Sequence, residues 1–362
     1  MGDRAEIRTL PYPIIVGRGA LQRIADIVEE VAPAHRYAVV TDSNVGPIYG
    51  SRVVNAFAPG RADLFTIPAG EVNKTRDTWA RLTDELLSAG FGRDSTVVSL
   101  GGGMVGDLAG FVAGTFMRGI PVVQVPTSLL AMIDASIGGK TGVDTPSGKN
   151  LVGLFYPPAA VVSDPQTLAT LPLNFLRTGL AEAIKHGAIA DSRYFESVTR
   201  ELPALLAAGA GASDSLTRVI VRSIEIKAGI VARDERERGL RKVLNFGHTI
   251  GHALEALSGY ELAHGEAVAI GMALESAVAE HAGIAEDGTS SSILGALRAA
   301  GLPTQRPEGM SGEKILEAMR ADKKARGGQV EYALPCRIGA MAGSKSGWAV
   351  TVADDIVREV LT

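Results

Sequence analysis

A stripe of polar side chains interrupts an apolar segment in the second half of the chain. If residues 241–255 form one helix, spacings of four, three, four and three align five polar residues on one face: Arg241, Asn245, His248, His252 and Glu255. Burying five polar groups is unfavourable unless they pair or coordinate something. A lone histidine on such a face is more often an ordinary core residue, but five polar residues in register favour a site.

Metal coordination is the chemistry that these residue types suit best. Catalytic zinc is commonly held by two histidines and a carboxylate, with one position left open for substrate. A third histidine, His264, stands at the expected start of another helix, and "AEAIKHG" places Glu182 and Lys185 three residues apart. Spacing alone does not choose among His248, His252 and His264. A metalloprotease is excluded, because position 249 is Thr where that helix motif requires Glu.

A glycine-rich turn indicates a second kind of site. "STVVSLGGGMVGDLAGF" reads as a strand, a glycine run and a helix, and Gly101, Gly103 and Gly106 satisfy the G-x-G-x-x-G spacing. Such a turn allows a pyrophosphate to approach the backbone at a helix N-terminus. The motif alone is weak, but Asp42 ends another expected strand, and "PAGEVNK" follows a third. The usual ribose acid lies about 20 residues after the glycines, so we expect a dinucleotide bound across strand ends in an unusual order.

Several cations lie in glycine-flanked segments and predict binding of an anionic ligand. A single lysine is more often a solvated surface charge, yet together these residues favour a ligand with a phosphate and a carboxylate. The set comprises Arg118, Lys140, Lys149 with the adjacent Asn150, Lys227, Lys323 and Lys324.

Two domains must position these groups. Residues 37–42, 63–68, 95–100, 121–126 and 159–164 form short β-branched runs that alternate with helical patterns, which is typical of a doubly wound parallel sheet. From about residue 173 the apolar residues recur at helical spacing, with few strand patterns between them. We therefore expect an α/β Rossmann-like parallel-sheet domain over 1–172 and a mainly α-helical domain over 173–362. Near the C-terminus, "QVEYALP" and "GWAVTV" predict a small hairpin followed by a closing helix.

Composition narrows the class of protein. The chain has 362 residues, 46% of them hydrophobic, and a formal net charge of −4, which argues against a nucleic-acid binder. The single cysteine, Cys336, excludes an internal disulfide and a cysteine-based zinc site. The start has no signal-peptide pattern, and no apolar run reaches the length of about 18 residues that a membrane helix needs. We expect a soluble cytoplasmic protein without a membrane or nucleic-acid partner.

Taken together, the motifs resemble those of the 3-dehydroquinate synthase family over nearly the whole chain. The matching segments are "GGGMVGDLAGF", "FMRG", "VPTSLLAMIDASIGGKTG", "GKNLVGLFYPP", "GLAEAIKHG", "DERERGLRKVLNFGHTIGHALE", "HGEAVAIGM" and "DKKARGG". The resemblance implies a lyase of the shikimate pathway for aromatic amino acid biosynthesis. It would convert 3-deoxy-D-arabino-heptulosonate 7-phosphate to 3-dehydroquinate and phosphate by transient NAD oxidation, phosphate elimination, reduction and an intramolecular aldol step.

The resemblance also implies roles for individual residues. The metal ligands are Glu182, His248 and His264, with zinc the usual ion and cobalt an alternative, while His252 faces the substrate. The NAD-binding positions are Asp42, Asn44, Glu71, Lys74, Gly103, Met104, Val105, Gly106, Asp107, Thr127, Ser128, Lys140, Lys149, Thr167, Leu168, Ala169 and Thr170. The family usually has Thr-Thr where this chain has Thr127 and Ser128, so a hydroxyl is kept at position 128.

The substrate positions implied are Asp134, Lys140, Lys149, Asn150, Lys185, Lys227, Glu237, Arg241, Asn245, His252, Lys323 and Lys324. Arg118 matches an arginine that the family lends across a homodimer interface. Three alternatives stay open: a related sugar phosphate cyclase of the 2-epi-5-epi-valiolone or 2-deoxy-scyllo-inosose synthase type, a metal-dependent polyol dehydrogenase, and a non-catalytic nucleotide-binding module. Lys227, Arg241 and Asn245 favour an acid substrate and therefore the dehydroquinate reaction.

Overall fold

The computed structural model describes residues 4–207, 213–259, 261–321 and 330–361. The chain divides into two compact units, one formed by Met1–Leu171 with Ala210–Ala228 and the other by Pro172–Gly209 with Gly229–Thr362. Residues 210–228 therefore join the first unit, although the sequence pattern grouped them with the helical region.

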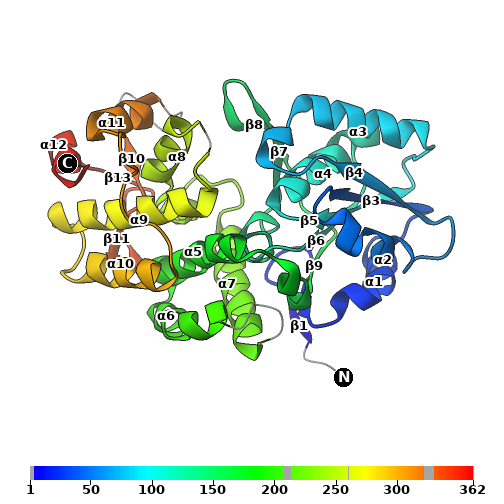
Figure 1. Ribbon diagram of the computed structural model, residues 1–362, viewed down its shortest axis with the longest axis horizontal. Helices are drawn as coiled ribbons and strands as arrows, with labels where there is room; N and C mark the ends of the chain where they lie inside the picture. The colour runs from blue at the N-terminus through cyan, green and yellow to red at the C-terminus, as the bar shows by residue number, and fades with distance from the viewer. Residues whose placement is uncertain (1–3, 208–212, 260, 322–329, 362) are drawn as a thin grey trace. The chain divides into compact units, whose positions relative to one another are not determined.

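A seven-stranded sheet forms the centre of the first unit, in the order β1-β2-β9-β6-β5-β3-β4 (Figure 1). Its strands are β1 (Arg4–Ile7), β2 (Ile14–Gly17), β3 (Arg36–Asp42), β4 (Ala62–Ile67), β5 (Ser95–Gly101), β6 (Val122–Pro126) and β9 (Ala160–Ser163). All neighbours pair in parallel except β1 and β2. The five strands expected from sequence all lie in the parallel part, which confirms the predicted fold class.

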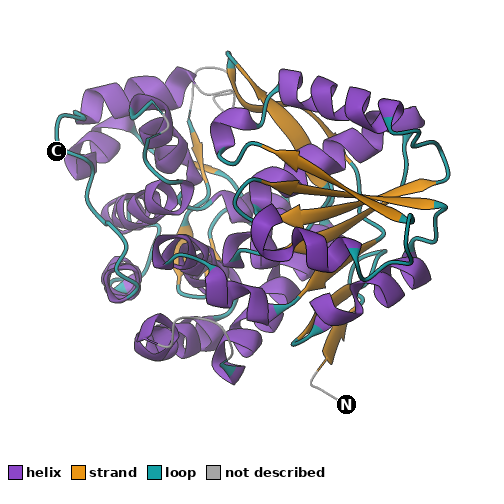
Figure 2. Cartoon of the chain, turned by 45° about the vertical axis from the view of Figure 1, so that its right-hand side comes forward, coloured by secondary structure: helices purple, strands orange, loops and turns teal. Residues whose placement is uncertain are grey.

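Helices cover both faces of this sheet (Figure 2). The covering helices are α1 (Ile24–Val31), α2 (Ser51–Val54), α3 (Arg76–Ser88) and α4 (Gly103–Thr115). Helix α7 (Asp214–Arg233) also belongs to this unit as far as residue 228. Alternation along the strands separates two cores, because Val39 and Val98 pack toward α1 and α2, whereas Val40 and Val97 pack toward α3 and α4.

A separate antiparallel hairpin, β7 (Lys140–Thr145) and β8 (Gly148–Phe155), packs beside α4 in the same unit. No strand was expected there, because its glycines obscure the alternation of apolar and polar residues on which strand prediction depends. The hairpin carries three of the predicted site residues, Lys140, Lys149 and Asn150.

The second unit is mainly helical. Its helices are α5 (Leu173–Ala190), α6 (Ser192–Ala207), α8 (His248–Leu257), α9 (His264–His281), α10 (Thr289–Ala299), α11 (Gly312–Ala321) and α12 (Asp354–Leu361). The short strands are β10 (Glu331–Tyr332), β11 (Pro335–Arg337), β12 (Ala340–Met341) and β13 (Val350–Thr351). The pairing of β10 with β13 and the closing helix α12 confirm the arrangement expected near the C-terminus. Within the described ranges, no helix has the length and apolarity to cross a membrane.

The expectation of one helix over residues 241–255 is wrong. A 3-10 helix covers Leu240–Asn245, and the α-helix α8 begins at His248 after a left-handed residue, Gly247, with φ of 80°. A side chain at Gly247 would place its Cβ 2.5 Å from Met272 Cγ and 2.8 Å from the Val268 carbonyl oxygen. The close approach of α9 therefore requires glycine here, and glycine permits the break.

Candidate functional site

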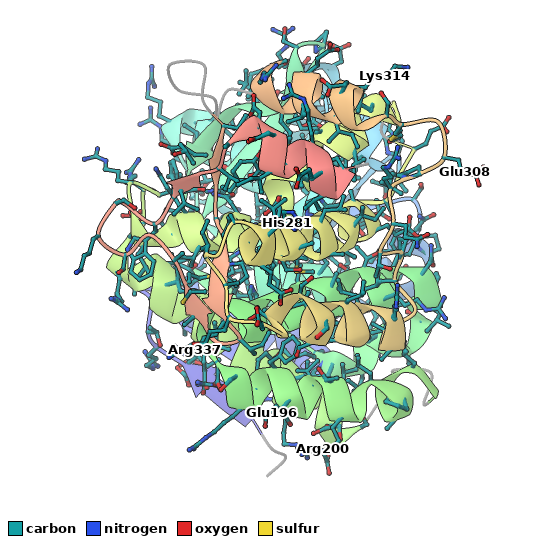
Figure 3. All side chains as sticks on the ribbon, turned by 90° about the vertical axis from the view of Figure 1, so that its left-hand side faces the viewer. Glu196, Arg200, His281, Glu308, Lys314 and Arg337 are labelled. Atoms are coloured by element: carbon teal, nitrogen blue, oxygen red, sulfur yellow. The ribbon has the colours of Figure 1, made fainter. Side chains whose placement is uncertain are left out.

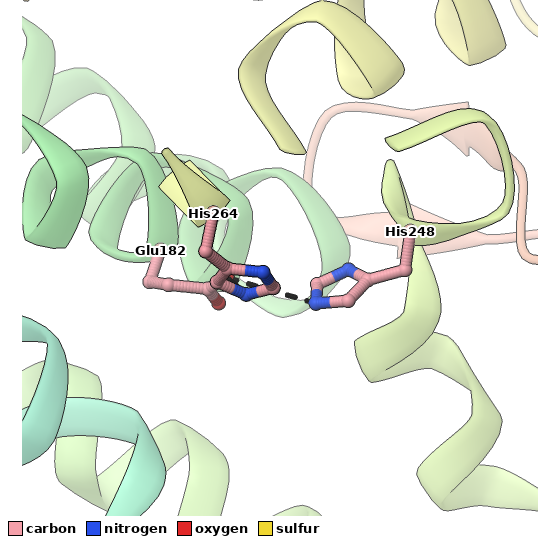
Figure 4. Close-up of side chains that lie close together, drawn as sticks. All are labelled: Glu182, His248 and His264. Carbon is pink, nitrogen blue, oxygen red and sulfur yellow. Dashed lines mark ion pairs between the residues drawn. The ribbon is translucent and has the colours of Figure 1, made fainter. Parts of the chain in front are cut away.

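Three side chains from three helices of the second unit converge on one point (Figure 4). Glu182 comes from α5, and His248 and His264 are the first residues of α8 and α9. The Nε2 atoms of His248 and His264 lie 3.9 and 4.0 Å from Glu182 Oε1. One ligand atom from each residue falls within 4.8 Å of the other two, so a single ion could contact all three.

Hydrogen bonds orient both imidazoles. His248 Nδ1 lies 3.2 Å from the Phe246 carbonyl oxygen, and His264 Nδ1 lies 3.4 Å from Oε1 of the buried Glu255. An Nδ1–H that donates to an oxygen leaves the Nε2 lone pair free as a metal ligand, the usual arrangement around zinc. Burial lowers the pKa of His264, but the hydrogen bond and charge of Glu255, with the charge of Glu182, outweigh it and raise that pKa.

The donor set fits a divalent ion. Glu182 is fully buried, and among the described residues neither carboxylate oxygen accepts a hydrogen bond, although Lys185 forms an ion pair with Oε2. A buried carboxylate without hydrogen-bond donors is unfavourable. One carboxylate and two imidazoles form the combination typical of catalytic zinc, and an ion held there would satisfy the orphaned oxygens.

His252 belongs to an overlapping group with Glu255 and His264. Its ring centroid lies 5.2 Å from that of His248 and 6.2 Å from that of His264. Because Glu255 already pairs with His264 Nδ1, this second group is less suited to a metal. His281, labelled in Figure 3, lies at the other end of α9 and pairs with Glu359 of α12 at 2.8 Å.

A loop before the 3-10 helix gathers further predicted residues. Asn245 Nδ2 donates to Glu237 Oε1 at 2.6 Å, and Arg241 Nη1 donates to the Glu235 carbonyl oxygen at 2.6 Å. Asp234 organises the loop by accepting the backbone N–H groups of Arg238, Gly239 and Arg241 at 3.0, 2.7 and 3.0 Å. Sequence reasoning missed Asp234, because its partners are backbone groups that leave no trace in residue type.

In the first unit, the predicted nucleotide-binding residues follow the carboxyl ends of five adjacent parallel strands. Asp42 ends β3, Glu71 and Lys74 follow β4, residues 103–107 follow β5, Thr127 and Ser128 follow β6, and residues 167–170 follow β9. The connections from β3 and β5 run to opposite sides of the sheet, so these two strands flank a topological switch point. Open α/β sheets bind their ligands at this edge and at this point.

The glycine turn leaves the start of α4 open. At Gly101 an added Cβ would lie 2.6 Å from Val105 Cγ2, so packing excludes a side chain there. At Gly106 an added Cβ would lie 2.9 Å from Gln124 Oε1, so the end of the Gln124 side chain would have to shift. Gly102 precedes the helix and supplies no side-chain cap. The first N–H groups of α4 are thus available to an anion, as in dinucleotide-binding turns.

Some of the predicted nucleotide-binding residues also have local structural roles. Asp42 Oδ1 accepts the N–H groups of Asn44 and Val45 at 2.8 and 2.9 Å, and Thr167 Oγ1 donates to the Asp164 carbonyl oxygen. Leu168 is fully buried and packs in the core. Among the predicted nucleotide-binding residues at these strand ends, Asn44, Ala169 and Thr170 are exposed.

Lys74 is buried among three carboxylates. Its Nζ pairs with Glu71, lies 3.2 Å from Asp107 Oδ2 and lies 3.7 Å from Asp144 Oδ1. Burial opposes its charge, but the three carboxylates outweigh it and raise the pKa of Lys74. For the Asp107 carboxyl, by contrast, burial is the largest cause and raises the pKa to about 6, even though the charge of Lys74 opposes the shift. Asp144, which no sequence pattern singled out, also accepts the Asn150 N–H at 2.8 Å and so links the β7–β8 hairpin to Lys74.

The remaining predicted residues are placed as follows. Lys227 Nζ donates to the carbonyl and carboxylate oxygens of Asp134 at 2.7 and 2.6 Å. Arg118 is exposed with φ of 69°, directly after Met117 with φ of 52°. Lys323 and Lys324 lie outside the described residues.

These features define the class of protein: one unit carries candidate nucleotide-binding residues at the strand ends of a parallel sheet, and the other carries a cluster of two histidines and a glutamate that suits a metal ion. The family model for the 3-dehydroquinate synthase N-terminal region matches residues 64–178, and that for the C-terminal region matches residues 179–325. A 3-dehydroquinate synthase from Symbiobacterium thermophilum is 46% identical over 332 residues, which cover 91% of this chain and 92% of that protein. The chain belongs to the 3-dehydroquinate synthase family.

Solved structures of related cyclases share the architecture. A 2-deoxy-scyllo-inosose synthase complexed with carbaglucose-6-phosphate, NAD+ and Co2+ is 26% identical, with a TM-score of 0.89 over 99% of both chains. The 2-epi-5-epi-valiolone synthase from Streptomyces hygroscopicus subsp. jinggangensis, with NAD+ and Zn2+ bound, is 28% identical, with a TM-score of 0.84 over 99% of this chain and 97% of that one.

The Asp234 loop yields a prediction about pH and stability. Burial opposes ionisation of this carboxyl, but the three backbone N–H groups and the charge of Arg241 outweigh it and lower the pKa of Asp234. A carboxylate whose pKa is lower in the folded state stabilises the protein above its unfolded pKa of about 3.9, and this contribution is lost as pH falls through the folded value. Asp234→Asn should therefore lower the free energy of unfolding by about 1 kcal/mol at pH 7, as measured by urea denaturation. The difference from wild type should shrink by about pH 3, and a difference independent of pH would contradict this role.

Proposed function

We propose that the chain is a 3-dehydroquinate synthase that converts 3-deoxy-D-arabino-heptulosonate 7-phosphate to 3-dehydroquinate and phosphate. This lyase reaction belongs to the shikimate pathway of aromatic amino acid biosynthesis. The observation that carries the proposal is the convergence of Glu182, His248 and His264 in a chain that is 46% identical to a relative bearing that name. The related cyclases with solved structures are 26% and 28% identical, which favours the dehydroquinate reaction over theirs.

The proposed cofactors are NAD and zinc, with cobalt as the alternative ion. Support comes from the strand-end residues of the first unit, from the donor set around Glu182, and from the two cyclase structures that contain NAD+ with Co2+ or Zn2+. When bound, NAD would accept and return a hydride, and the metal would polarise a substrate oxygen. Because the hydride returns, the overall reaction is redox-neutral.

The chain's own residues would bind and orient the substrate. The buried cations Lys185, Lys227 and Arg241 are suited to hold a carboxylate and a phosphate by charge-assisted hydrogen bonds. Lys185 is fixed beside Glu182 by its ion pair, and Arg241 is held by the Asp234 loop. His252, beside His248 but outside the three-ligand set, would contact substrate and hold a proton there.

The assay that tests this function supplies purified protein with NAD, zinc and the heptulosonate phosphate. We expect release of inorganic phosphate without net NADH, and Glu182→Gln should lower kcat/KM by more than about 100-fold, the upper end of losses seen for groups that only support a ligand. Steady NADH accumulation would instead indicate a polyol dehydrogenase. Turnover with sedoheptulose 7-phosphate alone would indicate the valiolone branch.

We also propose a cytoplasmic homodimer in which Arg118 reaches the neighbouring active site. Arg118 is exposed, and two successive non-glycine residues with positive φ give its turn a strained shape. Such strain, roughly 1–3 kcal/mol at each residue, is concentrated at functional positions.

Complementation between two inactive variants tests the role of Arg118. Arg118→Ala and Glu182→Ala should each be inactive alone. Co-expressed, they should recover about a quarter of wild-type activity, because half of the dimers are mixed and each mixed dimer has one complete site. Activity that stays at the sum of the two variants would show that Arg118 serves its own chain or that the protein does not form this dimer.

A further inference from the structure

The first turn of α8 is capped by a carboxylate from another helix. Glu275 lies in the middle of α9 and is fully buried. Its Oε2 accepts the Gly247 N–H at 2.7 Å, and its Oε1 accepts the Ile250 N–H at 2.9 Å. Gly247, the residue that caps α8, has no side chain with which to do this. Glu275 thus satisfies two backbone donors that a helix start leaves without partners.

The same contact region is sterically locked. A Cβ on Gly271 of α9 would lie 1.9 Å from the Gly247 carbonyl oxygen, and a Cβ on Gly247 would meet Met272 of the same helix. The backbones of α8 and α9 therefore approach more closely here than any side chain allows. Glu275 provides hydrogen bonds across this contact, and Gly247 and Gly271 allow the two backbones to approach closely.

This contact lies between two of the three candidate metal ligands. His248 directly follows Gly247, and its Nδ1 bonds to the carbonyl of Phe246, which directly precedes Gly247. His264 is the first residue of α9, the helix that carries Glu275. A rotation or shift of the α8 start would move His248 Nε2 away from Glu182, while His264 would stay with α9.

We propose that Glu275 is a positioning residue of the metal site, which holds the start of α8 so that His248 Nε2 faces Glu182. The proposal rests on the metal role proposed above for Glu182, His248 and His264. Glu275 is not one of the proposed metal ligands or substrate residues, and it acts through the backbone on either side of His248. Groups that orient metal ligands commonly change metal affinity by about 10- to 100-fold when they are altered.

The chain provides a matched control on the same helix. Glu280, five residues after Glu275, accepts the Ser290 N–H at 2.7 Å and caps the start of α10. None of the predicted metal, cofactor or substrate residues lies on α10. Both glutamates therefore join α9 to the start of another helix, but only Glu275 does so next to a metal ligand.

The experiment compares Glu275→Gln, Glu275→Asp and Glu280→Gln by zinc dissociation constant, measured by competition with a chromogenic chelator, and by thermal unfolding of the metal-free proteins. We expect Glu275→Gln to raise the zinc dissociation constant by about 10- to 100-fold and Glu275→Asp, which keeps the charge on a shorter side chain, to raise it less. Glu280→Gln should lower the melting temperature through loss of a helix cap and leave the zinc dissociation constant within about twofold of wild type.

Two results would overturn the proposal: wild-type zinc affinity in folded Glu275→Gln, or an equal loss of affinity in Glu280→Gln, which would reveal a general effect of helix capping. If Glu275→Gln does not fold, Glu275→Asp decides by the same criterion. Zinc binding by wild-type protein and by Glu182→Gln, measured in parallel, distinguishes a failure of the Glu275 proposal from a failure of the proposed metal site. Zinc binding that Glu182→Gln does not weaken would refute the proposed metal site itself.

Discussion

The buried carboxylate of Glu182 is the electrostatic constraint on which the helical unit depends. Its oxygens are removed from water and accept no hydrogen bond from the described residues, and Lys185 one turn along α5 forms an ion pair with it. Such a group is stable only where positive charge is brought to it. In their neutral forms the two imidazoles cannot supply a donor to Glu182 while their Nδ1–H groups donate to Phe246 and Glu255. A carboxylate and two lone pairs directed at one point are complementary to a divalent cation.

Other acidic side chains have structural roles within each of the two units. Asp42 closes the turn after β3, Asp234 gathers the loop that presents Arg241, Glu255 orients His264, and Glu275 caps α8. In each case a carboxylate accepts hydrogen bonds from N–H groups and thereby fixes their positions. The excess of 40 acidic over 36 basic residues is thus partly structural, and we propose that buried cations such as Lys185 and Arg241 meet an anionic ligand.

Residue patterns in the sequence predicted the parallel sheet. They did not predict every residue and helix break that shapes the candidate sites. Short β-branched runs predicted the five strands because burial on both faces requires continuous apolar sequence. The break at Gly247 was missed because it depends on the approach of Met272 and Val268, which are distant in sequence. The choice among three histidines stayed open for a similar reason, since it depends on which Nε2 atoms lie near Glu182. Asp144, Asp234 and Glu275 bond to backbone N–H groups, which every residue but proline has, so no motif marked them.

Anomalous diffraction at the zinc absorption edge, on crystals grown with one equivalent of zinc, tests the central claim most directly. The account predicts one strong peak within about 2.0–2.2 Å of a Glu182 oxygen and of the Nε2 atoms of His248 and His264. A peak bound by His252 and Glu255 instead, or no peak near Glu182, would contradict it.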